Sequence, residues 1–195
     1  MKTKQKINRQ EKILSVLADL TYATREQLQV INKLGGNRNA RRILFEMEKD
    51  NLINSVRYDK KIYYLSNKGS DRVGKNNSRL KKSWITHTLM RNDLYIKLGM
   101  PNDWKKEVPI KSNDEVLLIP DAMYKVNGEF FFIEIDNTQT MRTNYDKIKK
   151  YKELSRMIYQ QHRHHLTLVW YSVSEIRKEK LRLSCEENGV KYKIY

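Results

Sequence analysis

The sequence predicts a mixed α/β protein, of α/β or α+β class, in which a helical N-terminal domain precedes a second domain with a mixed central sheet. Three observations lead to this prediction. A chain of 195 residues is long enough for one large domain or two small ones. Apolar residues follow helical spacing in the N-terminal part, and continuous apolar runs typical of buried strands occur in the C-terminal part. Between these parts, residues 66–79 are poor in apolar side chains and have the composition of a linker.

The N-terminal part begins with two predicted helices. The first carries an apolar stripe at positions i, i+3, i+4 and i+7, formed by Ile13, Val16, Leu17 and Leu20. Thr24 followed by Gln27 has the spacing of a capping box and starts a second, short helix that continues through Ile31. A turn is expected at Leu34-Gly35-Gly36, because glycine readily takes a positive φ angle.

A third helix is predicted over residues 37–50, and it carries a cluster of arginines. Its apolar positions, again at helical spacing, are Ala40, Ile43, Leu44 and Met47. At 100° per residue, Arg38 and Arg42 lie on the opposite side of this helix and Arg41 flanks them. Such a face is either an ordinary solvated surface or a contact for nucleic acid, and the clustering of three arginines favours the second interpretation.

Two β-rich runs, residues 55–58 and 62–65, flank Asp59-Lys60-Lys61 and predict a hairpin with a basic tip. Three helices followed by such a hairpin are the order of a winged helix-turn-helix, which we expect over residues 1–70. The third helix would enter the major groove, and the hairpin would lie against the phosphate backbone. The residues expected to contact DNA are Asn37, Arg38, Asn39, Arg41, Arg42, Arg57, Lys60 and Lys61.

The net charge also points to nucleic acid. The chain has 39 Lys and Arg against 23 Asp and Glu, a formal charge of +16. Lysine and arginine bind phosphate by releasing counterions, so duplex DNA is the expected partner. There is no apolar run near the length of a membrane span and no apolar signal segment, so we expect a cytoplasmic protein that does not bind membranes. With Cys185 as the single cysteine, neither an internal disulfide nor a cysteine-based zinc site is expected.

The second domain is expected over residues 80–195, after a basic linker at residues 71–79. Helices and apolar strands follow one another along it. The predicted order is a helix (80–98), two strands (116–126 and 129–136), a long helix (140–159), a strand (166–171), a helix (175–188) and a last short strand (190–195). His162, His164 and His165 fall between the long helix and the next strand, and we interpret them as part of a solvated loop.

The dipeptide Asn127-Gly128 separates the two predicted strands and is typical of a two-residue type I′ turn. This turn sets the register of the hairpin and places Asp121 opposite Glu134. Asp136 lies two residues beyond Glu134 and shares its face of the sheet. Three carboxylates are therefore expected on one patch, although like charges that face one another destabilise a sheet.

Two explanations for such a patch remain open. The carboxylates of Asp121, Glu134 and Asp136 offer the hard oxygen ligands that Mg²⁺ or Mn²⁺ prefers. Alternatively, a Lys or Arg from a neighbouring helix neutralises them, or one carboxyl is protonated. Lys147 precedes Tyr151 by one helical turn in the long helix and is expected to reach the patch.

Ile119-Pro120-Asp121 together with Glu134-Ile135-Asp136 resembles the PD-(D/E)xK signature of the restriction-endonuclease-like fold. The resemblance implies that fold for the second domain, with Asp121 and Glu134 as metal ligands. Asp136 stands where the signature has its lysine, so we expect little or no cleavage. If the domain is a metal-dependent nuclease, its candidate catalytic residues are Asp121, Glu134, Asp136 and Lys147, with Asp136 as a third metal ligand.

A broader resemblance links the chain to the replication-relaxation family. It is carried by Tyr63-Tyr64-Leu65-Ser66, Lys68-Gly69, His87, Asn92, Pro120-Asp121-Ala122, Phe132-Ile133-Glu134-Ile135-Asp136 and residues 147–151. The resemblance implies a DNA-binding accessory protein of a plasmid or other mobile element, acting in replication, relaxation or mobilisation. We expect a homodimer that works with other plasmid replication or mobilisation proteins. The alternatives are a Mg²⁺- or Mn²⁺-dependent DNA nuclease and a transcriptional repressor.

Overall fold

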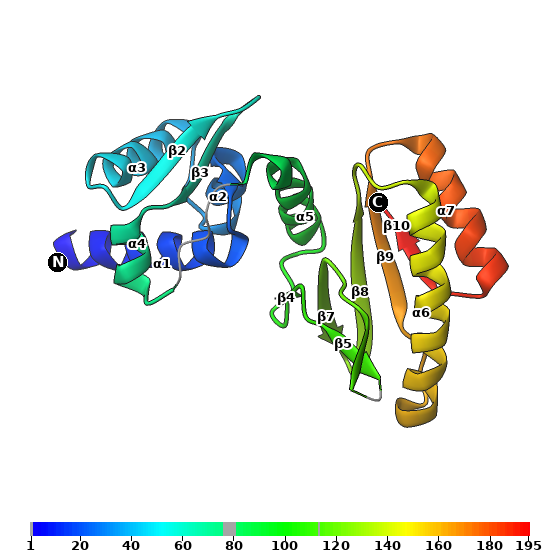
Figure 1. The fold of residues 1–195 in the computed structure, drawn as a ribbon. Helices are drawn as coiled ribbons and strands as arrows, with labels where there is room; N and C mark the ends of the chain where they lie inside the picture. The colour runs from blue at the N-terminus through cyan, green and yellow to red at the C-terminus, as the bar shows by residue number, and fades with distance from the viewer. Residues whose placement is uncertain (1, 76–80, 113) are drawn as a thin grey trace. The chain divides into compact units, whose positions relative to one another are not determined.

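A computed structural model describes residues 2–75, 81–112 and 114–195, and the chain divides into two compact units (Figure 1). The first unit ends at Lys97 and the second begins at Leu98. The first contains a three-stranded sheet and the second a five-stranded sheet, so the expected mixed α/β class is confirmed. No helix of the described residues is long and apolar enough to cross a membrane.

The first unit begins with the helices and the hairpin that the sequence predicts. Its elements are α1 (Lys2–Leu20), β1 (Ala23–Thr24), α2 (Arg25–Ile31), α3 (Asn37–Lys49), β2 (Ile53–Arg57), β3 (Lys61–Leu65), α4 (Asn67–Val73), a 3₁₀ turn (Lys82–Trp84) and α5 (Ile85–Lys97). The predicted capping box starts α2, since the Gln27 amide donates to Thr24 Oγ1 at 3.2 Å and the Thr24 amide donates to Gln27 Oε1 at 3.1 Å.

The core of the first unit lies between α1, α2, α3 and the sheet. The predicted apolar side of α3 is buried in full, and Ile13, Leu17 and Leu20 of α1 are buried with it. In the sheet, β3 lies between β1 and β2 and is antiparallel to both. The predicted hairpin is therefore confirmed, with Arg57 opposite Lys61 next to its turn.

The expected linker at residues 71–79 begins inside a helix. Residues 67–73 form α4, which Ser66 caps by accepting a hydrogen bond from the Gly69 amide at 3.0 Å. Gly69 fits closely against the backbone of the core, because a Cβ at this position would lie 2.0 Å from the carbonyl oxygen of Leu52. Residues 76–79 of the expected linker lie outside the described residues. The polar composition did not predict this helix, which packs closely against the core at Gly69.

The helix α5 belongs to the first unit, although the sequence suggested a second domain that starts at residue 80. Asn92 Nδ2 donates to the carbonyl oxygen of Tyr22 at 2.7 Å. Gln27 Nε2 donates to the carbonyl oxygen of Leu89 at 2.9 Å and to Asp93 Oδ1 at 2.7 Å. These buried and partly buried hydrogen bonds attach α5 to α2 and to the residue before β1, and the division between the units follows α5.

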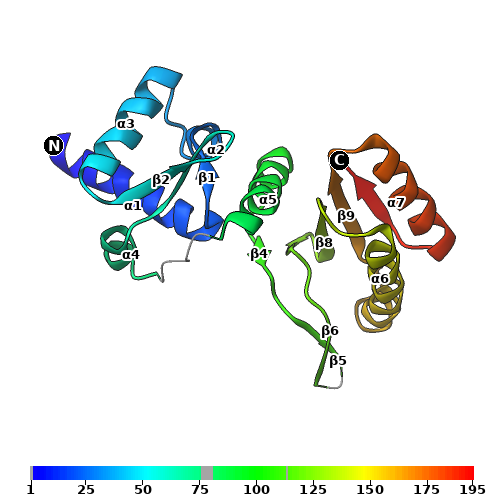
Figure 2. The same cartoon turned by 45° about the horizontal axis from the view of Figure 1, so that its top comes forward.

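The second unit is built around a mixed sheet with the strand order β10-β9-β8-β7-β4. Strands β8, β9 and β10 are parallel, whereas β7 pairs antiparallel with both β8 and β4. Its elements are β4 (Lys105–Lys106), β5 (Ile110–Ser112), β6 (Glu115–Leu118), β7 (Ala122–Val126), β8 (Glu129–Asp136), α6 (Met141–His162), β9 (Thr167–Ser172), α7 (Glu175–Asn188) and β10 (Tyr192–Ile194). The helices α6 and α7 lie side by side against the sheet (Figures 1 and 2).

The predicted register of the β7–β8 hairpin is confirmed, because Val126 pairs with Glu129 and Ala122 pairs with Ile133. Asn127 and Gly128 both have positive φ angles, as a type I′ turn requires. The predicted strand over residues 116–126 is interrupted, however, and forms β6 and β7. Pro120 lies at the break, where its missing N–H group prevents a regular ladder.

We expect Gly69→Ala to lower the free energy of unfolding of the chain by roughly 1–3 kcal/mol, as overpacking of a core does. The added Cβ would collide with the Leu52 carbonyl, which is backbone and cannot rotate away. Urea denaturation followed by circular dichroism measures this loss. Gly36→Ala is the matched control, because no atom lies within 4 Å of a Cβ there. Equal stability of both variants would contradict the close packing of α4.

Candidate functional site

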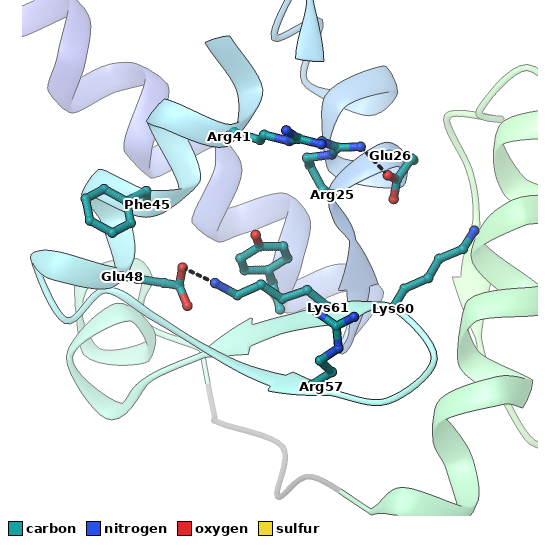
Figure 3. A pocket seen from close by; sticks show the side chains of 9 residues that line it. Arg25, Glu26, Arg41, Phe45, Glu48, Arg57, Lys60 and Lys61 are labelled. Atoms are coloured by element: carbon teal, nitrogen blue, oxygen red, sulfur yellow. Dashed lines mark hydrogen bonds and ion pairs between the residues drawn. The ribbon is translucent and has the colours of Figure 1, made fainter. Parts of the chain in front are cut away.

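The surface of the first unit that carries the predicted DNA contacts is formed by α3 and the β2–β3 hairpin. All eight predicted side chains are exposed, and on α3 they lie opposite the buried side of the helix. The structure gathers four of them, Arg41, Arg57, Lys60 and Lys61, around one hollow of about 420 Å³ (Figure 3). Arg41 comes from α3, whereas the other three come from the hairpin. We call this hollow the basic hollow.

Sequence reasoning missed five further residues that line the basic hollow. They are Arg25, Glu26, Phe45, Glu48 and Tyr63. Arg25 and Glu26 come from the start of α2, a separate helix, so no local pattern relates them to α3. Phe45 was detectable in principle, because helical spacing places it one turn after Arg41 on the polar side of α3.

Cations exceed carboxylates in this hollow. Glu48 Oε2 pairs with Lys61 Nζ at 2.7 Å, and this hydrogen bond raises the pKa of Lys61. Glu26 Oε1 pairs with Arg25 Nη2 at 2.5 Å. Within the described residues, Arg41, Arg57 and Lys60 have no carboxylate partner. These three cations are thus available to an anionic ligand.

The other predicted contacts lie outside the basic hollow. Arg42 Nη1 pairs with Glu46 Oε1 at 2.6 Å, and its Nη2 donates to Asn39 Oδ1 at 2.9 Å. Asn39 Nδ2 in turn donates to the carbonyl oxygen of Leu34 at 2.8 Å, which fastens the turn before α3. Arg38 and Asn37 are exposed in the first turn and a half of the helix. Asn39 therefore has a structural role, and its contact with DNA stays a prediction.

In the second unit, Glu134 is a buried carboxylate with two donors. Tyr151 OH donates to its Oε1 at 2.7 Å, and Lys147 Nζ lies 2.5 Å from its Oε2. The structure thus places Lys147 within reach of the acidic residues, as expected. Burial raises the pKa of Glu134 to about 7, the charge of Asp121 adds to this effect, and Lys147 opposes it.

Asp136 shares the helix-facing side of the sheet with Glu134 and is bonded to three other elements. Arg177 of α7 binds both carboxylate oxygens, through Nε at 2.7 Å and Nη2 at 2.5 Å. Asn144 Nδ2 of α6 donates at 2.7 Å and Ser172 Oγ of β9 donates at 2.9 Å. Burial alone would raise the pKa of Asp136, but these hydrogen bonds outweigh it and lower the pKa.

The third predicted carboxylate, Asp121, lies near Glu134 and directly precedes β7, and its Oδ2 accepts a hydrogen bond from the Ile135 amide at 2.6 Å. In the described part of the chain, no group of three or more His, Cys, Asp or Glu side chains is placed to hold a metal ion. The oxygens of Glu134 and Asp136 accept hydrogen bonds from protein groups instead. Lys147 and Arg177 thus supply the positive charge that the second explanation expects, and the binding of Mg²⁺ or Mn²⁺ stays a prediction.

The histidines near the end of α6 and the single cysteine lie apart from the acidic patch in character: the former lie beside aromatic rings and the latter lies in the core. His162 ends α6, and its ring lies 5.8 Å from that of His164 and 5.5 Å from that of Phe130, measured between centroids. Cys185 is buried in the core of the second unit, and burial raises the pKa of its thiol to about 12. A thiol of this kind is not a nucleophile near neutral pH.

Comparison with known proteins adds one positive finding. The sequence model of a family described as replication-relaxation matches residues 14–169. The match covers about four-fifths of the chain and extends over parts of both units. Neither a curated protein nor a solved structure matches the chain.

We expect Glu134→Gln to become more stable relative to the wild-type protein as the pH rises. The folded state holds the proton of Glu134 up to about pH 7, whereas an ordinary carboxyl releases it near 4.5. The wild-type protein therefore loses stability between these pH values, and the glutamine variant does not. The difference in free energy of unfolding should shift by roughly 1–3 kcal/mol between about pH 5 and pH 8, since one pKa unit corresponds to about 1.4 kcal/mol.

Urea titrations of both proteins across this pH range measure the shift. Asp136→Asn is the matched control, because the lowered pKa of Asp136 keeps this carboxylate charged throughout the range. The loss of stability in that variant should not change with pH above about 5. If the difference in free energy of unfolding between Glu134→Gln and the wild-type protein also stays constant across this pH range, the raised pKa of Glu134 is contradicted.

Proposed function

The chain belongs to the replication-relaxation family, and we propose that it serves the replication or relaxation of a plasmid or other mobile element by binding duplex DNA through its first unit. The observation that carries this proposal is the basic hollow between α3 and the hairpin, with three cations that lack a carboxylate partner among the described residues. In this proposal the first unit is a winged helix-turn-helix, with α2 and α3 as the two helices of the motif and β2–β3 as the wing.

The proposed contacts with DNA fall into two classes, those to base edges and those to phosphates. The major groove is about 12 Å wide and accommodates an α-helix, so the exposed side of α3 would lie in it. Arg38 and Arg41 of α3 would then face base edges, where arginine binds guanine in a bidentate manner. Arg57 and Lys60 near the hairpin turn would contact phosphates, which hold the protein on the duplex without selecting a sequence.

The second unit would add basic surface and a contact between protomers. The helix α6 carries six Lys and Arg residues against two Asp and Glu residues. On and next to α7, Val173 and Ile176 are 75% and 73% exposed, and such side chains suit a contact with a second copy or another replication protein. The proposal gives the second unit the restriction-endonuclease-like fold. The proposed role of this unit does not require it to cleave DNA.

We expect Arg57→Ala combined with Lys60→Ala to weaken binding to every duplex by a similar factor. The slope of log affinity against log salt should also fall by about 2, because each phosphate contact contributes roughly 0.9 to it. Fluorescence anisotropy with labelled duplexes at several salt concentrations measures both effects. Lys4→Ala combined with Lys12→Ala removes the same charge from exposed positions on α1 and is the matched control. Equal salt slopes for the two double variants would contradict binding by the hairpin.

A metal-dependent nuclease is the second candidate function, and the position of Lys147 beside Glu134, near Asp121, favours it. Incubation of the protein with supercoiled plasmid, with and without Mn²⁺, separates the two functions. Our proposal expects a shift of the plasmid on the gel without nicking. Nicking that requires Mn²⁺ and disappears in Asp121→Ala, but persists in Asp114→Ala, would favour the nuclease.

A further inference from the structure

The exposed side of α3 carries one apolar side chain, and that side chain is large. Phe45 is 66% exposed, although the helix has a separate core side that is fully buried. All other residues of α3 outside the core are polar or charged, namely Asn37, Arg38, Asn39, Arg41, Arg42, Glu46, Glu48 and Lys49. Phe45 therefore contributes little to the core of the first unit and presents a hydrophobic ring to the surroundings.

The neighbours of Phe45 indicate what kind of surface it meets. It lines the basic hollow, one helical turn after Arg41 and on the same side of the helix (Figure 3). Arg41 and Arg57 line the same hollow, so an apolar protein surface that covered Phe45 would have to leave these two cations without partners. The major groove of DNA satisfies both kinds of group, because it combines phosphates with the 5-methyl groups of thymine.

We propose that Phe45 is a specificity-determining residue that contacts the 5-methyl group of thymine in the major groove. This inference rests on the proposed function and adds that α3 selects thymine at one position of the DNA site. The rise from Arg41 to Phe45 is about 6 Å along the helix, and successive bases of a strand are about 3.4 Å apart. A guanine bound by Arg41 and the thymine bound by Phe45 should thus lie one or two base steps apart.

The test replaces thymine by uracil, which keeps base pairing and removes only the methyl group. Duplexes that the wild-type protein selects from a random-sequence pool are prepared with either base. The affinity of the wild-type protein should fall about fourfold for each contacted thymine, as expected for roughly 0.8 kcal/mol per buried methyl-sized group. Phe45→Ala should bind both duplexes with equal affinity, and Phe45→Leu should retain part of the preference for thymine.

Val116→Ala is the matched control, since it removes an exposed apolar side chain from the second unit, at a position with no role in the proposed binding, and should keep the full uracil effect. The inference is overturned if uracil leaves the affinity of the wild-type protein unchanged, or lowers the affinity of Phe45→Ala by the same factor. If Phe45→Ala binds too weakly to measure, the wild-type protein and Phe45→Leu decide the question. If the wild-type protein binds no duplex DNA at all, the proposed function itself is contradicted. This result differs from the two that overturn only the inference about Phe45.

Discussion

The buried charge of Asp136 is the constraint on which the arrangement of the second unit depends. A carboxylate in the interior is costly unless positive charge and hydrogen-bond donors surround it. Here those donors come from α6, β9 and α7, so strands and helices far apart in the sequence meet at the end of β8. Glu134 repeats this pattern two residues earlier, with both of its partners on α6. The acidic residues of β8 thus hold the two helices on one side of the sheet.

Local patterns were sufficient for the elements that form from neighbouring residues. The apolar side of α3, the capping box of α2 and the turn at Asn127-Gly128 all depend on short spacings, and the structure contains each of them. The helix α4 and the attachment of α5 depend on contacts between distant residues. Gly69 meets Leu52, and Asn92 meets Tyr22 across 70 positions, so neither contact leaves a periodic signal in the sequence.

The candidate site shows the same limit. The arginines of α3 and the basic tip of the hairpin were recognisable from residue type and predicted element. Their grouping with Arg25 and Tyr63 was not, because these residues come from α2 and β3 and meet the others through tertiary structure. In the second unit, strand register predicted that Asp121 would lie near Glu134. It did not predict that Arg177, 41 residues further on, would engage both oxygens of Asp136.

Glu48 has a consequence for how the first unit would meet a double helix. Its Oε1 accepts a hydrogen bond from Ser55 Oγ at 2.6 Å, and its Oε2 pairs with Lys61, so one carboxylate on α3 bonds to both strands of the hairpin. The spacing between α3 and the hairpin is therefore set during folding. Binding does not have to lose conformational entropy to order these two elements relative to each other. Under the proposed function, these bonds favour one spacing between α3 and the hairpin when the first unit binds DNA. Differences in groove width or bendability between duplexes would then change affinity even at base pairs that no side chain touches.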